Sequence, residues 1–132
     1  MTKSTEMTDP RVVLYARVGT EAQARDDHHA LNDQLTELRD YAASQGWLNI
    51  DEFSETINGL RHDRPQLEAV LRLAQSQAFD ILLVHELSRL SRSIPHIIEI
   101  LDLLENHQVG FASVQEPDFD FTAWRKTAAL II

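Results

Sequence analysis

The hydrophobic and polar positions of this chain follow two periods in turn, which predicts strands that alternate with helices. An apolar run over residues 11–18 predicts a strand, and Gly19 directly after it predicts a turn. From Ala30 the apolar positions recur at helical spacing, and Gly46 is placed to end that helix. Residues 47–53 then have the composition of a second strand.

The second half of the chain continues this alternation. Residues 54–63 predict an exposed loop, and Pro65 suits the first turn of a helix with a buried stripe. The apolar residues within 79–86 predict a central strand that is buried on both faces. A helix over 93–107, a strand over 110–114, a loop over 115–121 and the start of another helix at residue 122 complete the pattern.

This order of elements predicts an α/β fold with a mostly parallel sheet of about four to five strands flanked by helices. In such sheets, functional groups gather beyond the carboxyl ends of the strands. The helix over 93–107 carries six large aliphatic residues within 97–104 alone, more than one sheet-facing stripe needs, so we expect it to meet a further partner.

Composition narrows the class of protein. The 132 residues, 43% hydrophobic and 25% charged, suit one globular domain, with residues 1–10 as a flexible polar start. The absence of cysteine, of a signal peptide and of a long apolar run favours a cytoplasmic protein. The net charge of −9 argues against this chain gripping a DNA duplex by itself.

Cofactor signatures are missing as well. No glycine-rich nucleotide fingerprint follows the first strand, and the six histidines lack the spacing of metal ligands. We therefore expect neither a cofactor nor a metal ion.

Arginines mark the candidate site. Four of them follow predicted strands or begin predicted helices: Arg17, Arg64, Arg89 and Arg92. Arg64 precedes a helix, where a cation opposes the helix dipole, so it serves something other than helix stability. Arg89 and Arg92 are three residues apart and would share a face if that stretch is helical. Converging guanidinium groups are suited to holding a phosphate.

Several short motifs now occur in a recognisable order. They are Tyr15-Ala16-Arg17-Val18-Gly19-Thr20, Gln23, Leu31-x-x-Gln34, Asp63-Arg64-Pro65 and Leu87-Ser88-Arg89-Leu90-Ser91-Arg92-Ser93. Together they resemble the N-terminal catalytic domain of the serine site-specific recombinases, a family of resolvases, DNA invertases and large serine integrases. The resemblance covers about residues 11–132, the last of which would lie early in the family's long C-terminal helix.

The resemblance implies a flavodoxin-like fold and DNA cleavage through a phosphoserine intermediate, followed by strand exchange, without a cofactor. It implies DNA as substrate, bound mainly by C-terminal parts absent from this chain, and a homodimer that forms a tetramer in the synaptic complex. By resemblance, the phosphate-binding and positioning residues are Arg17, Gln34, Arg64, Arg89 and Arg92. The roles of Glu55 and Ser88, which stand where many members have aspartate, stay open.

One position departs from the family pattern. Gly19 stands where the family has its nucleophilic serine, and without a hydroxyl no covalent intermediate can form. Two interpretations remain: a recombinase catalytic domain whose nucleophile has been lost, or a non-enzymatic regulatory or dimerisation module derived from a recombinase. An unrelated phosphorylatable receiver domain is disfavoured, because the first strand is not followed by the acidic cluster that such a domain needs.

Overall fold

Four strands and five helices make up the part of the chain described by the computed structural model, which covers residues 9–19, 30–57 and 63–128. In chain order they are β1 (Arg11–Val18), α3 (Leu31–Ser44), β2 (Asn49–Thr56), α4 (Pro65–Gln75), β3 (Ile81–Val84), α5 (Leu87–Leu90), α6 (Ile94–Asn106), β4 (Gly110–Ser113) and α7 (Phe121–Ala128).

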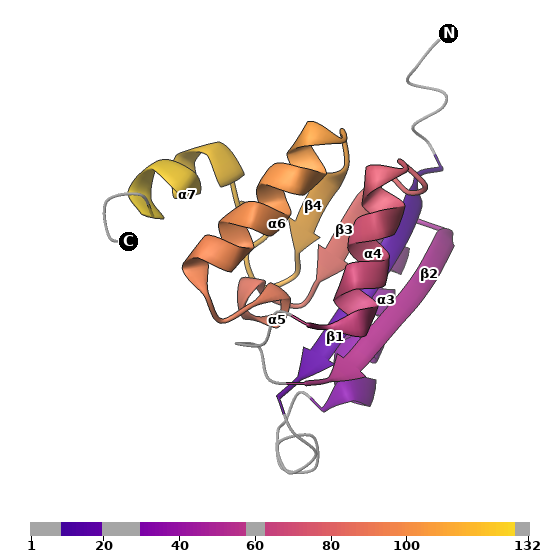
Figure 1. The fold of residues 1–132 in the computed structure, drawn as a ribbon. Helices are drawn as coiled ribbons and strands as arrows, with labels where there is room; N and C mark the ends of the chain where they lie inside the picture. The colour runs from indigo at the N-terminus through magenta and orange to yellow at the C-terminus, as the bar shows by residue number, and fades with distance from the viewer. Residues whose placement is uncertain (1–8, 20–29, 58–62, 129–132) are drawn as a thin grey trace, which may run out of the picture.

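The strands form one parallel sheet in the order β2-β1-β3-β4, as Figure 1 shows. The α/β class with a parallel sheet flanked by helices is therefore confirmed. β1 and β3 are the inner strands, and their side chains are almost entirely buried on both faces. Both are continuous apolar runs, because neither face of an inner parallel strand meets water.

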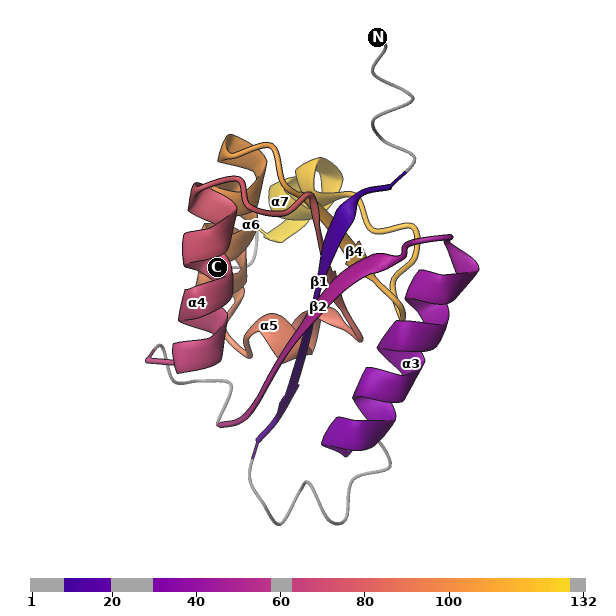
Figure 2. The same ribbon diagram turned by 90° about the vertical axis from the view of Figure 1, so that its right-hand side faces the viewer.

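Helices cover both faces of the sheet (Figure 2). α3 covers one face, where Leu38 and Ala42 pack on the side chains of β1 that point that way, such as Leu14. α4 and α6 cover the other face, where Leu67 and Ile100 belong to the larger core cluster. Successive β1 residues point to opposite faces, so Tyr15 and Arg17 lie on the side of α4 and α6.

β2 differs from the sequence prediction. It runs from Asn49 to Thr56 and pairs with β1 along its whole length, whereas we expected a strand over 47–53 and a loop from Ser54. The final residues are polar and so resemble a loop, but their backbone is bonded to β1 opposite Arg17. Pairing with a neighbouring strand overrides the local propensity of polar residues.

α6 packs against several elements of its own chain. Four of its aliphatic residues are buried: Ile97, Ile100, Leu101 and Leu104. α6 packs against the sheet, α4 and α7, and Arg125 of α7 forms an ion pair with Asp102 of α6. Among the described residues, no helix has the length and apolar character that crossing a bilayer requires.

Candidate functional site

Arg17 is the last but one residue of β1, and its guanidinium group is held by backbone carbonyls. Its Nη1 donates to the Ile57 oxygen at 2.9 Å, its Nη2 to the Ser88 oxygen at 2.7 Å, and its Nε to the Arg89 oxygen at 3.0 Å. The last two oxygens belong to the single-turn helix α5, whose terminal carbonyls need partners outside the helix. Arg17 is only 1% exposed, so β1 and α5 are joined by a buried cation.

Arg64 reaches the same carbonyl from the other side. It is the N-cap residue of α4 and is fully buried, and its Nη2 donates to the Tyr15 hydroxyl at 2.7 Å and to the Arg89 oxygen at 3.0 Å. Two guanidinium groups thus share one acceptor. Within the described part of the chain, Arg64 Nη1 is buried and has no hydrogen-bond partner. A buried donor without an acceptor is costly and is satisfied when an anion binds.

Glu55, whose role the sequence left open, joins three parts of the site. Its Oε2 accepts a 2.5 Å hydrogen bond from the Tyr15 hydroxyl and lies 3.8 Å from Arg64 Nε. The same carboxylate accepts from the backbone N–H groups of Gln66 and Leu67 in the first turn of α4. Glu55 therefore caps α4, favourably placed for the helix dipole, and sets the position of Arg64.

Ser88 contributes through its backbone. Its carbonyl oxygen accepts from Arg17, a bond that any residue at that position could supply.

Arg89 and Arg92 do not share a helical face. α5 ends at Leu90 and Ser91 is extended, so Arg92 lies outside the helix and is exposed, and the helical condition for a shared face is not met. Arg89 is buried; its Nη1 donates to the Arg17 carbonyl at 3.2 Å, and its Nε lies 3.5 Å from Glu86 Oε2. The structure brings Arg17, Arg64 and Arg89 into direct contact, with Arg92 at the surface beside them.

Gln34 holds the backbone of Arg17 from the opposite face of the sheet. Its Oε1 accepts from the Arg17 N–H at 3.3 Å, and its Nε2 donates to the Arg17 carbonyl at 2.9 Å. Gln34 is fully buried on α3, so an amide that can both donate and accept fixes the end of β1.

Gly19 follows the end of β1, half-buried and two residues beyond Arg17. It carries no side-chain atom that could attack a phosphate. Thr20 and Gln23, the other residues of the first motif region, lie outside the described residues.

Positive charge accumulates at this end of the sheet. Burial, together with the neighbouring charges of Arg64, Arg89 and Arg92, lowers the pKa of Arg17 to about 10. The group remains charged at neutral pH. Glu55 lies beside Arg64 and Glu86 beside Arg89, so the four arginines outnumber the carboxylates that pair with them among the described residues, and the site is suited to a bound anion.

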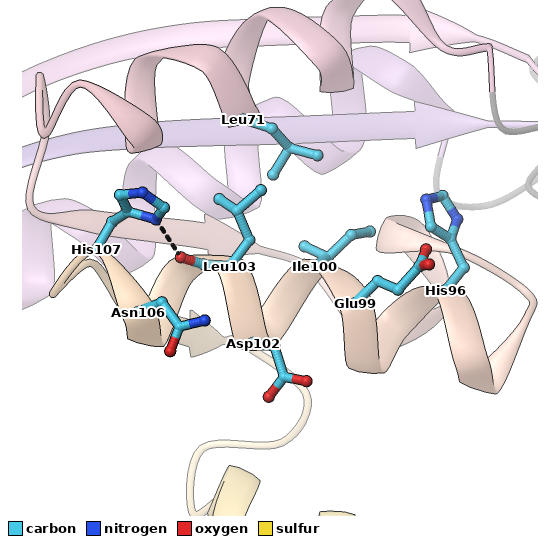
Figure 3. A pocket seen from close by; sticks show the side chains of 8 residues that line it. All are labelled: Leu71, His96, Glu99, Ile100, Asp102, Leu103, Asn106 and His107. Atoms are coloured by element: carbon cyan, nitrogen blue, oxygen red, sulfur yellow. Dashed lines mark hydrogen bonds between the residues drawn. The ribbon is translucent and has the colours of Figure 1, made fainter.

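A groove of about 540 Å³ lies elsewhere, between α4 and α6, where Leu71, His96, Glu99 and Asp102 line it (Figure 3). None of the four arginines borders it. In the described ranges, no three histidine or acidic side chains gather to hold a metal ion.

Fold and site together define an α/β domain that carries a buried arginine cluster at the carboxyl end of its sheet. Residues 12–131 match the family model described as the N-terminal domain of resolvase. The chain therefore belongs to the resolvase N-terminal catalytic domain family of the serine recombinases.

Relatives and solved structures agree with this assignment. The chain is 36% identical to the Tn917 transposon resolvase of Enterococcus faecalis over 103 residues, which cover 77% of this chain and 48% of that protein. It is 37% identical to a probable DNA-invertase of Sinorhizobium fredii over 81% of this chain and 30% of that protein. The crystal structure of the catalytic domain of TP901-1 integrase superposes with a TM-score of 0.76 at 28% identity, covering 91% of this chain and 88% of that one.

The chain thus spans about half the length of the Tn917 resolvase and 30% of the length of the probable DNA-invertase.

Proposed function

We propose that this chain is the catalytic domain of a site-specific DNA recombinase that keeps its phosphate-binding residues and lacks its nucleophile. The observation that carries the proposal is the contact among Arg17, Arg64 and Arg89, in which a buried Arg64 nitrogen has no acceptor within the described residues. A phosphodiester oxygen would supply that acceptor.

The proposed roles follow from the positions of the side chains. Arg64 and the exposed Arg92 contact phosphate oxygens and neutralise the charge that develops during phosphoryl transfer. Arg17 and Arg89 hold β1 and α5 together, and Gln34 fixes the backbone of Arg17 on the other side. Glu55 and Tyr15 orient Arg64.

Gly19 lacks the hydroxyl group that cleavage of the DNA strand would need. By family resemblance a serine hydroxyl at this position attacks the phosphorus and forms the phosphoserine bond, and glycine has no oxygen to form it. We therefore propose that the chain binds a DNA phosphate without cleaving the strand. We also propose that it acts in the cytoplasm and that it assembles with other copies of itself.

The test restores the missing hydroxyl. Residues 1–132 with Gly19→Ser are joined to the C-terminal part of Tn917 resolvase and mixed with a supercoiled plasmid that carries the recombination site of that resolvase. We expect a protein–DNA adduct that survives denaturant, because the positioning and the charge stabilisation are already in place. The unaltered chain in the same fusion should give none.

Two further variants make the result specific. Arg92→Ala in the Gly19→Ser fusion should reduce adduct formation strongly, whereas Arg72→Ala, an exposed arginine on α4, should leave it unchanged. If the Gly19→Ser fusion binds DNA as a folded oligomer and forms no adduct, the regulatory module is favoured over the recombinase.

A further inference from the structure

Side chains of α3 hold the ends of two strands, β1 and β3, from the α3 side of the sheet. One turn beyond Gln34, Glu37 reaches the residue that follows β3: its Oε1 lies 2.8 Å from His85 Nε2. His85 is 1% exposed, whereas the Glu37 side chain is 42% exposed. α3 therefore grips the end of β1 through Gln34 and the end of β3 through Glu37.

His85 leads directly into the turn that holds the arginines. Only Glu86 separates it from α5, whose Ser88 and Arg89 carbonyls accept from Arg17 and Arg64. Beyond β4, the Gln115 N–H donates to the His85 carbonyl at 2.9 Å, and Glu116 accepts from the Leu87 N–H at 3.2 Å. The chain between β3 and α5 is thus held from two directions.

We propose that His85 and Glu37 form a positioning pair, which holds α5 at the distance from β1 that its carbonyls need to hold Arg17 in place and to align Arg64 for a phosphate. The two residues are 48 apart in sequence and neither belongs to the motifs of the arginine site. The phosphate part of this inference rests on the proposed function, but the alignment of Arg17 does not.

The physical reason is the narrow range of hydrogen-bond lengths. Arg17 and Arg64 are bound to the α5 carbonyls at 2.7 to 3.0 Å, and such bonds weaken when the atoms separate by a few tenths of an ångström. Removing the Glu37 carboxylate takes an acceptor from a buried imidazole, which then favours conformations that bring it toward water. α5 follows two residues behind His85 and would shift with it.

The experiment measures Arg17 directly, without a ligand. The Nε–H group of Arg17 gives a distinct signal in nitrogen-15 NMR, and its hydrogen-exchange rate reports the bond to the Arg89 carbonyl. We expect Glu37→Ala to raise this rate about tenfold and to weaken the binding of inorganic phosphate about tenfold, measured against chloride at equal ionic strength. Glu37→Gln should restore both values, since its amide oxygen accepts the same bond.

Two controls separate positioning from general stability. Asp40→Ala, which removes an exposed carboxylate one turn further along α3, should change neither value. Glu37→Asp keeps the charge and shortens the side chain, so it should act in the same direction as Glu37→Ala with a smaller effect, even if the alanine variant does not fold.

The outcomes are distinct. If the Glu37 variants lower the melting temperature but leave the exchange of the Arg17 Nε–H unchanged, the positioning role is wrong and the pair is only structural. If the unaltered protein does not bind phosphate, the proposed function fails, and the exchange rate alone still decides whether the pair aligns Arg17.

Discussion

Arg11 and Arg17 lie at opposite ends of the same strand, β1, and they differ in burial and in the groups to which they donate hydrogen bonds. Arg11 has a half-exposed side chain and forms an ion pair with Asp80, its Nη2 lying 3.1 Å from Oδ1, while its backbone N–H donates to the same carboxylate. Arg17 is buried and donates to three backbone carbonyls, and no described carboxylate forms an ion pair with it.

The pKa of each residue records this difference. The hydrogen bond and charge of Asp80 raise the pKa of Arg11, whereas burial, together with Arg64, lowers the pKa of Arg17 to about 10. A structural arginine is neutralised by a nearby acid. Burial among other cations disfavours the charge of Arg17 even though its hydrogen bonds stabilise the fold, and such an arrangement is typical of groups kept for binding or catalysis.

The largest effect that the comparison predicts is on the free energy of unfolding. Arg17→Ala leaves the carbonyls of Ile57 and Ser88 without this donor and the Arg89 carbonyl with Arg64 alone, so we expect a loss of about 3 kcal/mol. Arg11→Ala removes an exposed pair and should cost less than about 1 kcal/mol. Urea denaturation of the two variants measures both losses. Equal losses would show that the two ends of β1 do not differ as described.

A smaller effect should appear in alkaline solution. Because the folded-state pKa of Arg17 lies below its unfolded value, the unfolded chain binds more protons than the folded one above about pH 10. The contribution of Arg17 to stability therefore rises with pH in this window. We expect the stability difference between the unaltered protein and Arg17→Ala to grow by about 1 kcal/mol from pH 9 to pH 11. A difference that stays constant over this range would mean that the pKa of Arg17 is not lowered.

The smallest effect concerns another exposed pair, Arg39 with Glu52, whose Nε and Oε2 lie 2.5 Å apart. Its hydrogen bond with Arg39 lowers the pKa of Glu52, so the stabilisation is present above the ordinary pKa and is lost as pH falls through the lowered value. Glu52→Gln should cost about 0.5 kcal/mol at pH 7, and this cost should shrink as the pH falls towards 3. Denaturation at both pH values, with and without 1 M salt, measures this. A loss that persists at pH 3 would point to packing instead of charge.

Hydrophobic pattern alone was enough to predict most of the fold. The unbroken apolar run before His85 indicated an inner strand, and the helical stripes after Ala30 and Pro65 indicated the covering helices. β2 was harder, because its last residues are polar and only their pairing with β1 makes them a strand. Local composition does not record a bond to a distant segment.

In the candidate site, too, some features could be predicted from the sequence and others could not. The sequence indicated Arg17, Arg64, Arg89 and Arg92 through their places beside predicted elements, and the family resemblance added Gln34. It did not show that two guanidinium groups share the Arg89 carbonyl or that Glu55 caps α4, since both depend on where α5 and β2 lie relative to one another.

The sequence by itself determined the order of elements, the family and the absence of a side-chain hydroxyl at Gly19, because these are properties of residue types and their spacing. Tertiary structure decided which cations are neutralised and which are not. Arg11 and Arg17 are the same residue on the same strand, and only the segments packed around them, Asp80 at one end and α5 at the other, make one a surface ion pair and the other a buried cation. Burial and the charges nearby set the free energy of a cation, and both are properties of the folded chain.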